Sequence, residues 1–221
     1  MSVLKGLKAF EQLDRTYVSD GPKVRWLKLE DGKSVKARFV NELDDESPNY
    51  NSDFDVAIVI SEHTNPADYR KKAVCTMESE GRCFGCEMAR KQTEEERKKG
   101  SWRARFRYYT NLLVDDGIED PYVAVWSQGI GNKSAFQTIR EYALDTGSIT
   151  NREWKMTRKG SDQTTTYLLI PRDPDTDKFD WSDVEPFDLM KVVREIPYAE
   201  QEQYYLGFDS AVASDTKNLD W

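Results

Sequence analysis

The feature that most constrains this chain is the grouping of its only histidine and its three cysteines between residues 63 and 86. The pattern is His63-x11-Cys75-x7-Cys83-x2-Cys86, and a Cys-x-x-Cys turn lets two thiolates reach one ion. Gly85 inside that turn gives the backbone room to wrap. Three sulfurs and one nitrogen complete a tetrahedron and leave no position for water. The pattern therefore predicts one structural zinc ion, Zn2+, bound by His63, Cys75, Cys83 and Cys86.

Two other interpretations of the four residues remain open. Free cysteines are often small buried hydrophobes, and a histidine can sit in a core without binding metal. A redox Cys-x-x-Cys is less favoured, because no thioredoxin-like βαβ pattern surrounds the pair. Three cysteines are an odd number, which argues against a disulfide framework and agrees with a reducing compartment. No apolar run approaches the roughly 20 residues that span a bilayer, so we expect a cytoplasmic protein without a membrane partner.

The net charge of −8 is unevenly distributed along the chain. Residues 1–170 carry 27 basic and 27 acidic side chains, whereas residues 171–221 carry 5 basic and 13 acidic ones. A body with balanced charge can still contain a basic groove. The overall charge therefore does not exclude a protein that binds nucleic acid.

The remaining sequence is rich in short strands that are separated by turn residues, and helices are few. We expect a hairpin at residues 24–40 around Asp31-Gly32, a strand at residues 54–60, strands at residues 103–114 and 122–126, and a hairpin at residues 152–170. Helices are expected at residues 2–13, 84–99, 134–144 and 183–195.

This order predicts a mainly β fold with helices (α+β), with an OB-fold-like barrel as the architecture. The expected organisation is an N-terminal arm (1–20), an OB-like core (21–170) with an inserted zinc-binding subdomain (61–90), a linker with C-terminal helices (171–206) and an acidic tail (207–221).

A basic and aromatic stretch follows the cysteines. Residues 97–109 hold six basic side chains and no acid. On a strand, Arg103, Arg105, Arg107 and Tyr109 share one face. Guanidinium groups beside rings suit a phosphate backbone with stacked bases. The predicted nucleic-acid-binding residues are Arg103, Arg105, Arg107, Tyr108, Tyr109, Trp126, Trp26, Lys155, Arg158 and Lys159. The alternative is that the arginines form a solvated strand face and the rings belong to the core.

The order of the four metal ligands and the segment at residues 103–114, RARFRYYTNLLV, resemble the T-even bacteriophage single-stranded DNA-binding (helix-destabilising) protein family. In that family a basic cluster runs into an aromatic pair and an Asn-aliphatic strand at about this distance after the last cysteine, and an acidic C-terminal tail is a family trait. The resemblance covers residues 20–170 and the tail. It implies an OB-type barrel with a zinc excursion and binding of single-stranded DNA during phage replication, recombination or repair.

The sequence of residues 207–221 predicts a solvated peptide whose last residues could bind a partner protein. Asp215, Leu219, Asp220 and Trp221 combine acid with apolar side chains, which suits a basic-rimmed pocket on a replication or recombination protein. The same carboxylates could also compete with phosphates for a basic groove.

An enzyme is not expected from this sequence. The lone histidine is assigned to the metal, so no histidine-based general base remains, and the carboxylates show no metal-nuclease spacing. Three rival functions stay open: an RNA-binding or translational regulator with the same groove, a zinc-stabilised protein–protein adaptor, and a nuclease with an unrecognised carboxylate site. Binding competition between single-stranded DNA, duplex DNA and RNA would separate them.

Overall fold

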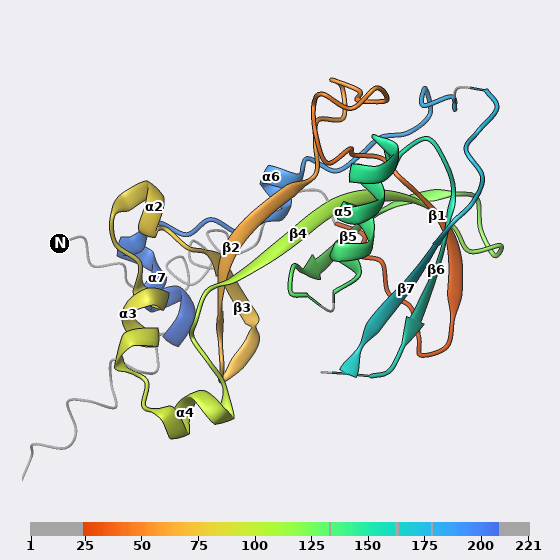
Figure 1. Ribbon diagram of the computed structural model, residues 1–221. Coiled ribbons are helices and arrows are strands. Elements are labelled where there is room, and N and C mark those ends of the chain that lie inside the picture. Colours follow the sequence, from red (N-terminus) through yellow and green to blue (C-terminus); the bar gives the residue numbers. More distant parts are fainter. Residues whose placement is uncertain (1–23, 133, 162–163, 178, 208–221) are drawn as a thin grey trace, which may run out of the picture.

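A computed structural model describes residues 24–132, 134–161, 164–177 and 179–207. In these residues the fold is a seven-stranded, mainly antiparallel sheet with a few helices, so the predicted α+β class is confirmed (Figure 1). The strands are β1 (Ser34–Phe39), β2 (Ile58–Asn65), β3 (Asp68–Val74), β4 (Arg105–Asp115), β5 (Tyr122–Gly129), β6 (Trp154–Lys159) and β7 (Thr166–Pro171). The helices are α2 (Met77–Glu80), α3 (Phe84–Lys91), α4 (Glu94–Lys99), α5 (Ala135–Thr146), α6 (Leu189–Val192) and α7 (Tyr198–Leu206).

The long strand β4 organises the sheet. One edge of β4 pairs with β5 along most of its length, and the other edge is divided between two strands. The first half of β4 pairs with β2 and the second half pairs with β1, which gives the order β3-β2-β4-β1-β6-β7. At the division, the buried Asn41 side chain accepts the backbone N–H of Asn111 at 2.7 Å. This hydrogen bond satisfies a backbone N–H at the point where β4 changes its partner from β2 to β1.

The main core lies between the inner faces of β1, β4, β5, β6 and β7 and the helix α5. Phe39 is fully buried, and its ring meets that of Trp154 edge-on at 5.5 Å. Ile139 is the fully buried residue of α5 in this core. Sixteen buried residues form the cluster, enough for this part of the chain to fold around an apolar interior.

A smaller region carries the four predicted ligands. We call residues 61–102 together with α7 the metal lobe. Its core contains five buried residues: Ala73, Phe84, Trp102, Tyr204 and Tyr205. Figure 1 shows α2, α3 and α7 grouped at one end of the molecule, with α5, β6 and β7 at the other. The predicted subdomain at residues 61–90 is therefore too short, because α7 supplies part of its core from far along the chain.

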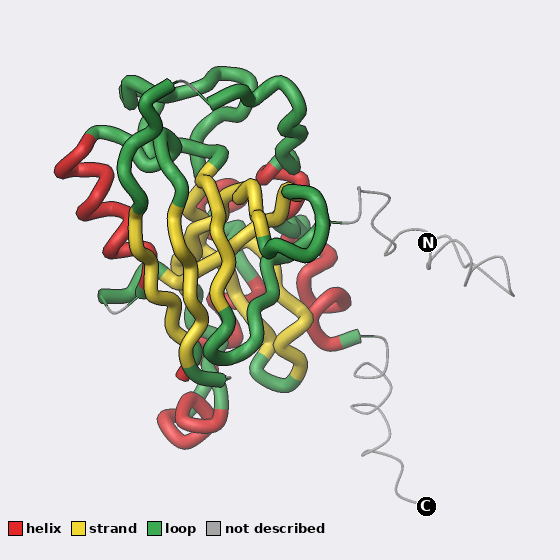
Figure 2. The backbone as a smooth tube through the Cα atoms, turned by 90° about the vertical axis from the view of Figure 1, so that its right-hand side faces the viewer, coloured by secondary structure: helices red, strands yellow, loops and turns green. Residues whose placement is uncertain are grey.

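The sheet is open. Among the described residues no backbone ladder joins β5 to β7, so the OB-fold-like barrel predicted from the sequence is not confirmed. The rings of Trp126 on β5 and Tyr167 on β7 meet across the gap at 5.5 Å. In the view of Figure 2 the strands form one curved layer with helices at its margins.

Several predicted elements differ from the structure. The segment at residues 24–29 does not pair with β1 as a hairpin, because Trp26 instead bridges in parallel to Val125 of β5. The helix predicted at residues 183–195 is reduced to the four residues of α6, because Pro186 lacks the N–H that a helix interior needs. Strand β3 was not predicted. The arm at residues 1–20 and the tail beyond Gly207 lie outside the described residues. No helix in the described part of the chain could cross a membrane.

Candidate metal centre and binding groove

His63 is held in one orientation by its backbone surroundings. It lies on β2, is almost completely buried, and its Nδ1 is 2.6 Å from the carbonyl oxygen of Trp102. A carbonyl only accepts, so Nδ1 carries a hydrogen, and loss of the proton from Nε2 would leave the lone pair of that nitrogen for a metal ion. Metal-binding histidines are oriented in the same way by a carbonyl or carboxylate behind the ring. Nε2 lies 3.4 Å from the Sγ of Cys86.

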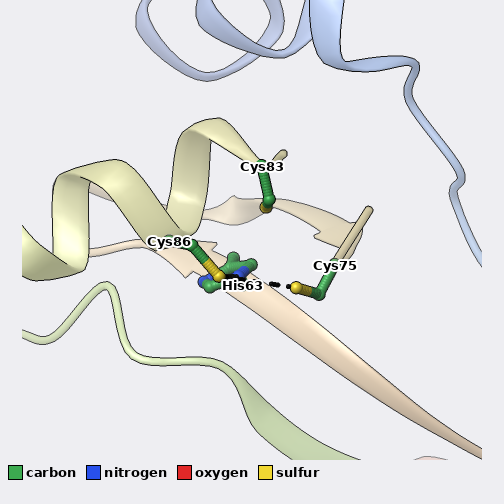
Figure 3. Close-up of side chains that lie close together, drawn as sticks. All are labelled: His63, Cys75, Cys83 and Cys86. Atoms are coloured by element: carbon green, nitrogen blue, oxygen red, sulfur yellow. Dashed lines mark hydrogen bonds between the residues drawn. The ribbon is translucent and has the colours of Figure 1, made fainter. Parts of the chain in front are cut away.

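The three cysteines reach the histidine from two short elements (Figure 3). Cys75 directly follows β3, and its backbone N–H donates to the carbonyl of Ser61. Cys83 caps the N-terminus of α3, and Cys86 lies in the first turn of that helix. The Sγ atoms of Cys75 and Cys86 are 3.6 Å apart, and the four ligand atoms all lie within 4.8 Å of one another. His63, Cys75, Cys83 and Cys86 are therefore close enough to bind one metal ion, as the sequence predicted.

Gly85 is required by the imidazole ring. A Cβ at this position would lie 2.4 Å from Cγ of His63. The sequence analysis explained Gly85 by the bending of the Cys-x-x-Cys turn, but the structure gives a different reason. The helix passes so close to the ring that only a glycine fits between them.

The surroundings of His63 and Cys83 shift their pKa values in the directions that favour an imidazolium and a thiolate. Burial opposes charge on Cys83, yet the hydrogen bond from His63 and backbone N–H groups lower the pKa of Cys83 to about 6. Burial also opposes charge on His63, but its contacts with Cys83 and Trp102 raise its pKa. Burial and the neighbouring thiol of Cys75 raise the pKa of Cys86 to about 12. A cation that binds here would displace these protons, as metal binding to thiols requires.

Buried polar side chains tie the ligand loop to α7. The side chain of Gln201 accepts the backbone N–H of Phe84 at 2.8 Å and donates to Oγ1 of Thr76 at 3.0 Å. The Thr76 hydroxyl in turn donates to the carbonyl of Arg82 at 2.7 Å. These bonds fix both ends of the loop between Cys75 and Cys83, so α7 positions the ligands although it supplies none.

A groove with a volume of about 1060 Å³ lies between the metal lobe and the main sheet. Its floor comes from β2 and β4, and its other lining residues come from Trp26, β3, β5 and the segment at residues 187–195, which includes α6. Figure 1 shows α6 beside β2 and β4. The charged lining consists of five basic side chains and three acidic ones, a net charge of +2: Arg70, Lys72, Arg107, Lys191 and Arg194 against Glu62, Asp188 and Glu195.

A buried carboxylate organises the floor of the groove. Glu62 accepts the hydroxyl of Tyr109 at 2.6 Å and lies 3.4 Å from Nε of Arg107. Arg107 also donates to Oγ of Ser127 at 3.0 Å. Burial, reinforced by Arg107, lowers the pKa of Lys72, and Glu62 opposes that shift. Arg107 is therefore fixed in position with part of its guanidinium facing the groove.

The structure divides the predicted nucleic-acid-binding residues into two groups. Arg107, Tyr109, Trp26 and Trp126 line the groove. Trp26 is 41% exposed, whereas Trp126 is 2% exposed and packs its ring against the core, so Trp26 is the accessible indole.

The other predicted residues do not border the groove. Tyr108 is a correction: it is fully buried, and its ring packs against Phe136, so it is a core residue that no base can reach. Arg103 and Arg105 are exposed outside the groove. Lys155 and Lys159 alternate with the buried Trp154 and Met156, which places them on the outer face of β6. Arg158 is committed to the carbonyl of Leu29 and to Thr165.

Sequence reasoning missed several residues of the groove: Arg70, Lys72, Tyr167, Phe187, Lys191 and Arg194. The run Arg70-Lys71-Lys72 was a usable sign of charge in the metal lobe. The wall at residues 187–195 had no such sign, because its place depends on a reciprocal pair of bonds between the Asn111 side chain and the backbone of Phe187.

A scan against protein-family models finds no match for this chain, and a search of the curated proteins finds none either.

Proposed function

We propose that this chain binds single-stranded DNA in the groove between the metal lobe and the main sheet. The observation that carries the proposal is the groove lining, in which basic side chains lie beside the exposed ring of Trp26 and the half-buried rings of Tyr167 and Phe187. Single strands bind to such surfaces because phosphates pair with the cations while bases stack on aromatic faces. The binding would protect transient single strands during DNA replication, recombination or repair, without strong sequence preference.

The metal in the proposed function is zinc, in a structural role. Three thiolates and one imidazole are a soft donor set of the kind that holds tetrahedral zinc. Two thiolates on such an ion lie about 3.7 Å apart, since each zinc–sulfur bond is about 2.3 Å. The 3.6 Å between Cys75 and Cys86 fits that spacing. When bound, zinc would cross-link the metal lobe. Four protein ligands leave no open coordination position for a substrate, so the proposal includes no enzymatic activity.

The connectivity of the main sheet supports an OB-type barrel that is opened at one seam. The strands β1, β4 and β5 are followed by α5 and then by β6 and β7, and β1 pairs with both β4 and β6. Five strands with a helix before the fourth match the Greek-key order of that fold, in which the second and third strands bind oligonucleotides. The metal lobe is inserted between the first two of these strands. This arrangement is consistent with the resemblance to the T-even phage family.

The first test compares ligands. The wild-type protein should prefer single-stranded DNA over a duplex of the same sequence, and its affinity should fall steeply with salt. Equal affinity for single and double strands would contradict the proposal. Tighter binding of RNA would favour translational control, and no binding of any nucleic acid would favour the protein–protein adaptor.

The second test uses two arginines on the same strand. Arg107 lines the groove and Arg105 does not, although they lie two residues apart. Arg107→Ala should flatten the slope of log affinity against log salt by about 0.7, the contribution of one phosphate contact on a single strand. Arg105→Ala is the matched control and should leave the slope unchanged. The groove assignment is wrong if both variants change the slope equally.

The acidic tail is proposed to compete with DNA for the groove and to contact replication or recombination proteins through Leu219 and Trp221. Its position lies outside the described residues, so the proposal rests on composition. Carboxylates on a tether act at high effective concentration. Deleting residues 208–221 should raise affinity for single strands at low salt, and the gain should shrink as salt screens the competition. Identical affinities of the truncated and full-length proteins would leave only the partner-docking role.

A further inference from the structure

A second cavity, of about 630 Å³, adjoins the groove at its β5 end. Gln128 and Tyr167 line both cavities, so the two are neighbours that share a rim. The second cavity lies where β5 and β7 do not pair, beyond the point at which the rings of Trp126 and Tyr167 meet. We call it the end pocket. The rings of Trp126 and Tyr167 thus fill one part of the gap between β5 and β7, and the end pocket occupies the part beyond them.

The chemistry of the end pocket differs from that of the groove. No charged side chain is among its described lining residues, which are Gln128, Gly129, Gly131, Asn132, Ser134, Ala135, Thr164, Thr165, Thr166 and Tyr167. Amides and hydroxyls both donate and accept hydrogen bonds. The hydroxyl of Ser134 is buried and has no hydrogen-bond partner in the part of the chain that the structure describes. A phosphate needs cations for charge pairing, whereas the edge of a nucleobase needs neutral donors and acceptors placed together.

We infer that the end pocket takes one nucleobase of a single strand whose phosphates lie in the adjoining groove. Tyr167 stands on the shared rim and is the ring on which that base or its neighbour stacks. The inference rests on the proposed function and adds to it a terminal, uncharged base subsite. Neutral groups without a fixed charge pattern accept different bases, so the subsite contributes affinity with little sequence preference.

Two glycines make the inference testable without disturbing the fold. A Cβ at Gly129 or Gly131 would meet no atom within 4 Å, and neither residue has a left-handed φ. Because both glycines line the end pocket and a Cβ on either meets no obstacle, a leucine at either position is expected to reduce the space in the pocket. Gly131→Leu is the main variant, and Gly129→Leu fills the same pocket from the neighbouring position. Thermal unfolding of both proteins checks that the fold is retained.

The measurement is affinity for oligodeoxythymidylates of increasing length, over the range of roughly 4 to 16 nucleotides that one OB-type site covers. The wild type should show a gain of about 10-fold at the length that first reaches the end pocket, since one stacked base contributes about that factor. Gly131→Leu should lose this step and keep wild-type affinity for shorter oligonucleotides. Tyr167→Ala should lower affinity for the longer ones about 10-fold, while Tyr167→Phe should retain it.

Tyr69→Ala is the matched aromatic control, because Tyr69 is 60% exposed and lines neither cavity. The inference is overturned if both leucine variants keep the step, or if they lose affinity equally at every length. Failure of the wild type to bind any oligonucleotide would overturn the proposed function itself. Wild-type binding together with unchanged leucine variants would overturn the end pocket alone.

Discussion

The main sheet and the metal lobe are stabilised by different kinds of interaction. Sixteen buried residues form the core of the main sheet, and the aromatic rings of Phe39, Trp126 and Trp154 pack against one another there. The apolar core of the metal lobe contains only five buried residues, and the lobe also places a histidine, a threonine and a glutamine in its interior. Small apolar cores are usually insufficient alone, and a metal then supplies the missing free energy.

The two regions also differ in which parts of the sequence build them. The core of the main sheet is built from segments between residues 27 and 169, whereas the metal lobe needs α7 from the C-terminal part of the chain. Tyr204 closes the free edge of β3, since its hydroxyl accepts the N–H of Lys72 and donates to the carbonyl of the same residue. The two regions are therefore expected to respond separately to metal removal and to core substitutions.

The largest effect is expected from metal removal. A structural zinc site contributes on the order of 10 kcal/mol, more than the core of the metal lobe can replace. Treatment with a strong chelator, or the substitution Cys83→Ser, should unfold the metal lobe and leave the main sheet folded. Hydrogen exchange should show fast amides in β3, α3 and α7 and protected amides in β1, β5 and β6.

Two results would contradict the expectation that the metal lobe and the main sheet unfold separately. Loss of protection in both regions together would mean that the chain is one cooperative unit. Full protection of the metal lobe after complete metal removal would mean that its core and its hydrogen bonds suffice. Elemental analysis of protein purified without chelator gives the reference, with one zinc expected per chain.

The second-largest effect is a loss of stability expected from a substitution in the core of the main sheet. Phe39 is fully buried among aromatic rings, so Phe39→Ala should lower the free energy of unfolding by about 3–5 kcal/mol. The metal content should stay unchanged, because Phe39 does not contact the metal lobe core. Phe106→Ala is the matched control, since Phe106 is 59% exposed on β4. Urea titration measures both variants, and a loss of bound metal in Phe39→Ala would show that the regions are coupled.

Sequence predicted the metal site better than any other feature, for a physical reason. The four ligands lie within one short segment, so local chain geometry brings them together. Most strands were also predicted, because their β-branched and aromatic residues favour extended backbone and because β6 begins with alternating burial, which leaves a period of two in the sequence. Pairing between distant segments leaves no such trace, which is why the bridge of Trp26 to Val125 was not predicted.

The groove was only partly predictable for the same reason. Alternation correctly placed Arg107 and Tyr109 on one face, but it could not show that Tyr108 faces a helix and is fully buried. It also could not place Arg70 and Lys72 of β3 or Arg194 after α6, which reach the groove from two distant segments. These residues meet because the end of β3 and the segment after Phe187 lie together, where the backbone N–H of Val74 donates to the carbonyl of Arg194 at 2.9 Å.

The third effect tests how closely the metal lobe is packed. Gly85→Ala brings a methyl group to 2.4 Å from the His63 ring, so either the helix or the imidazole must shift. Overpacking of this kind costs about 1–3 kcal/mol, and here it should appear as weaker metal binding. Gly129→Ala is the control in the main sheet, because its methyl group meets nothing within 4 Å. Competition with a chromogenic chelator measures the metal affinity, and unchanged affinity in Gly85→Ala would contradict the tight contact.

The smallest effect compares the N-terminal caps of one helix from each region. Thr93 forms a full capping box with Glu96 at the start of α4, whereas the hydroxyl of Ser134 at the start of α5 makes no cap bond and has no partner among the described residues. Thr93→Ala should therefore cost about 1 kcal/mol and increase hydrogen exchange in α4. Ser134→Ala removes a buried hydroxyl that bonds to nothing in the protein, so stability should be unchanged or slightly higher. A loss of about 1 kcal/mol in Ser134→Ala would mean that its hydroxyl is satisfied by ordered water in the end pocket.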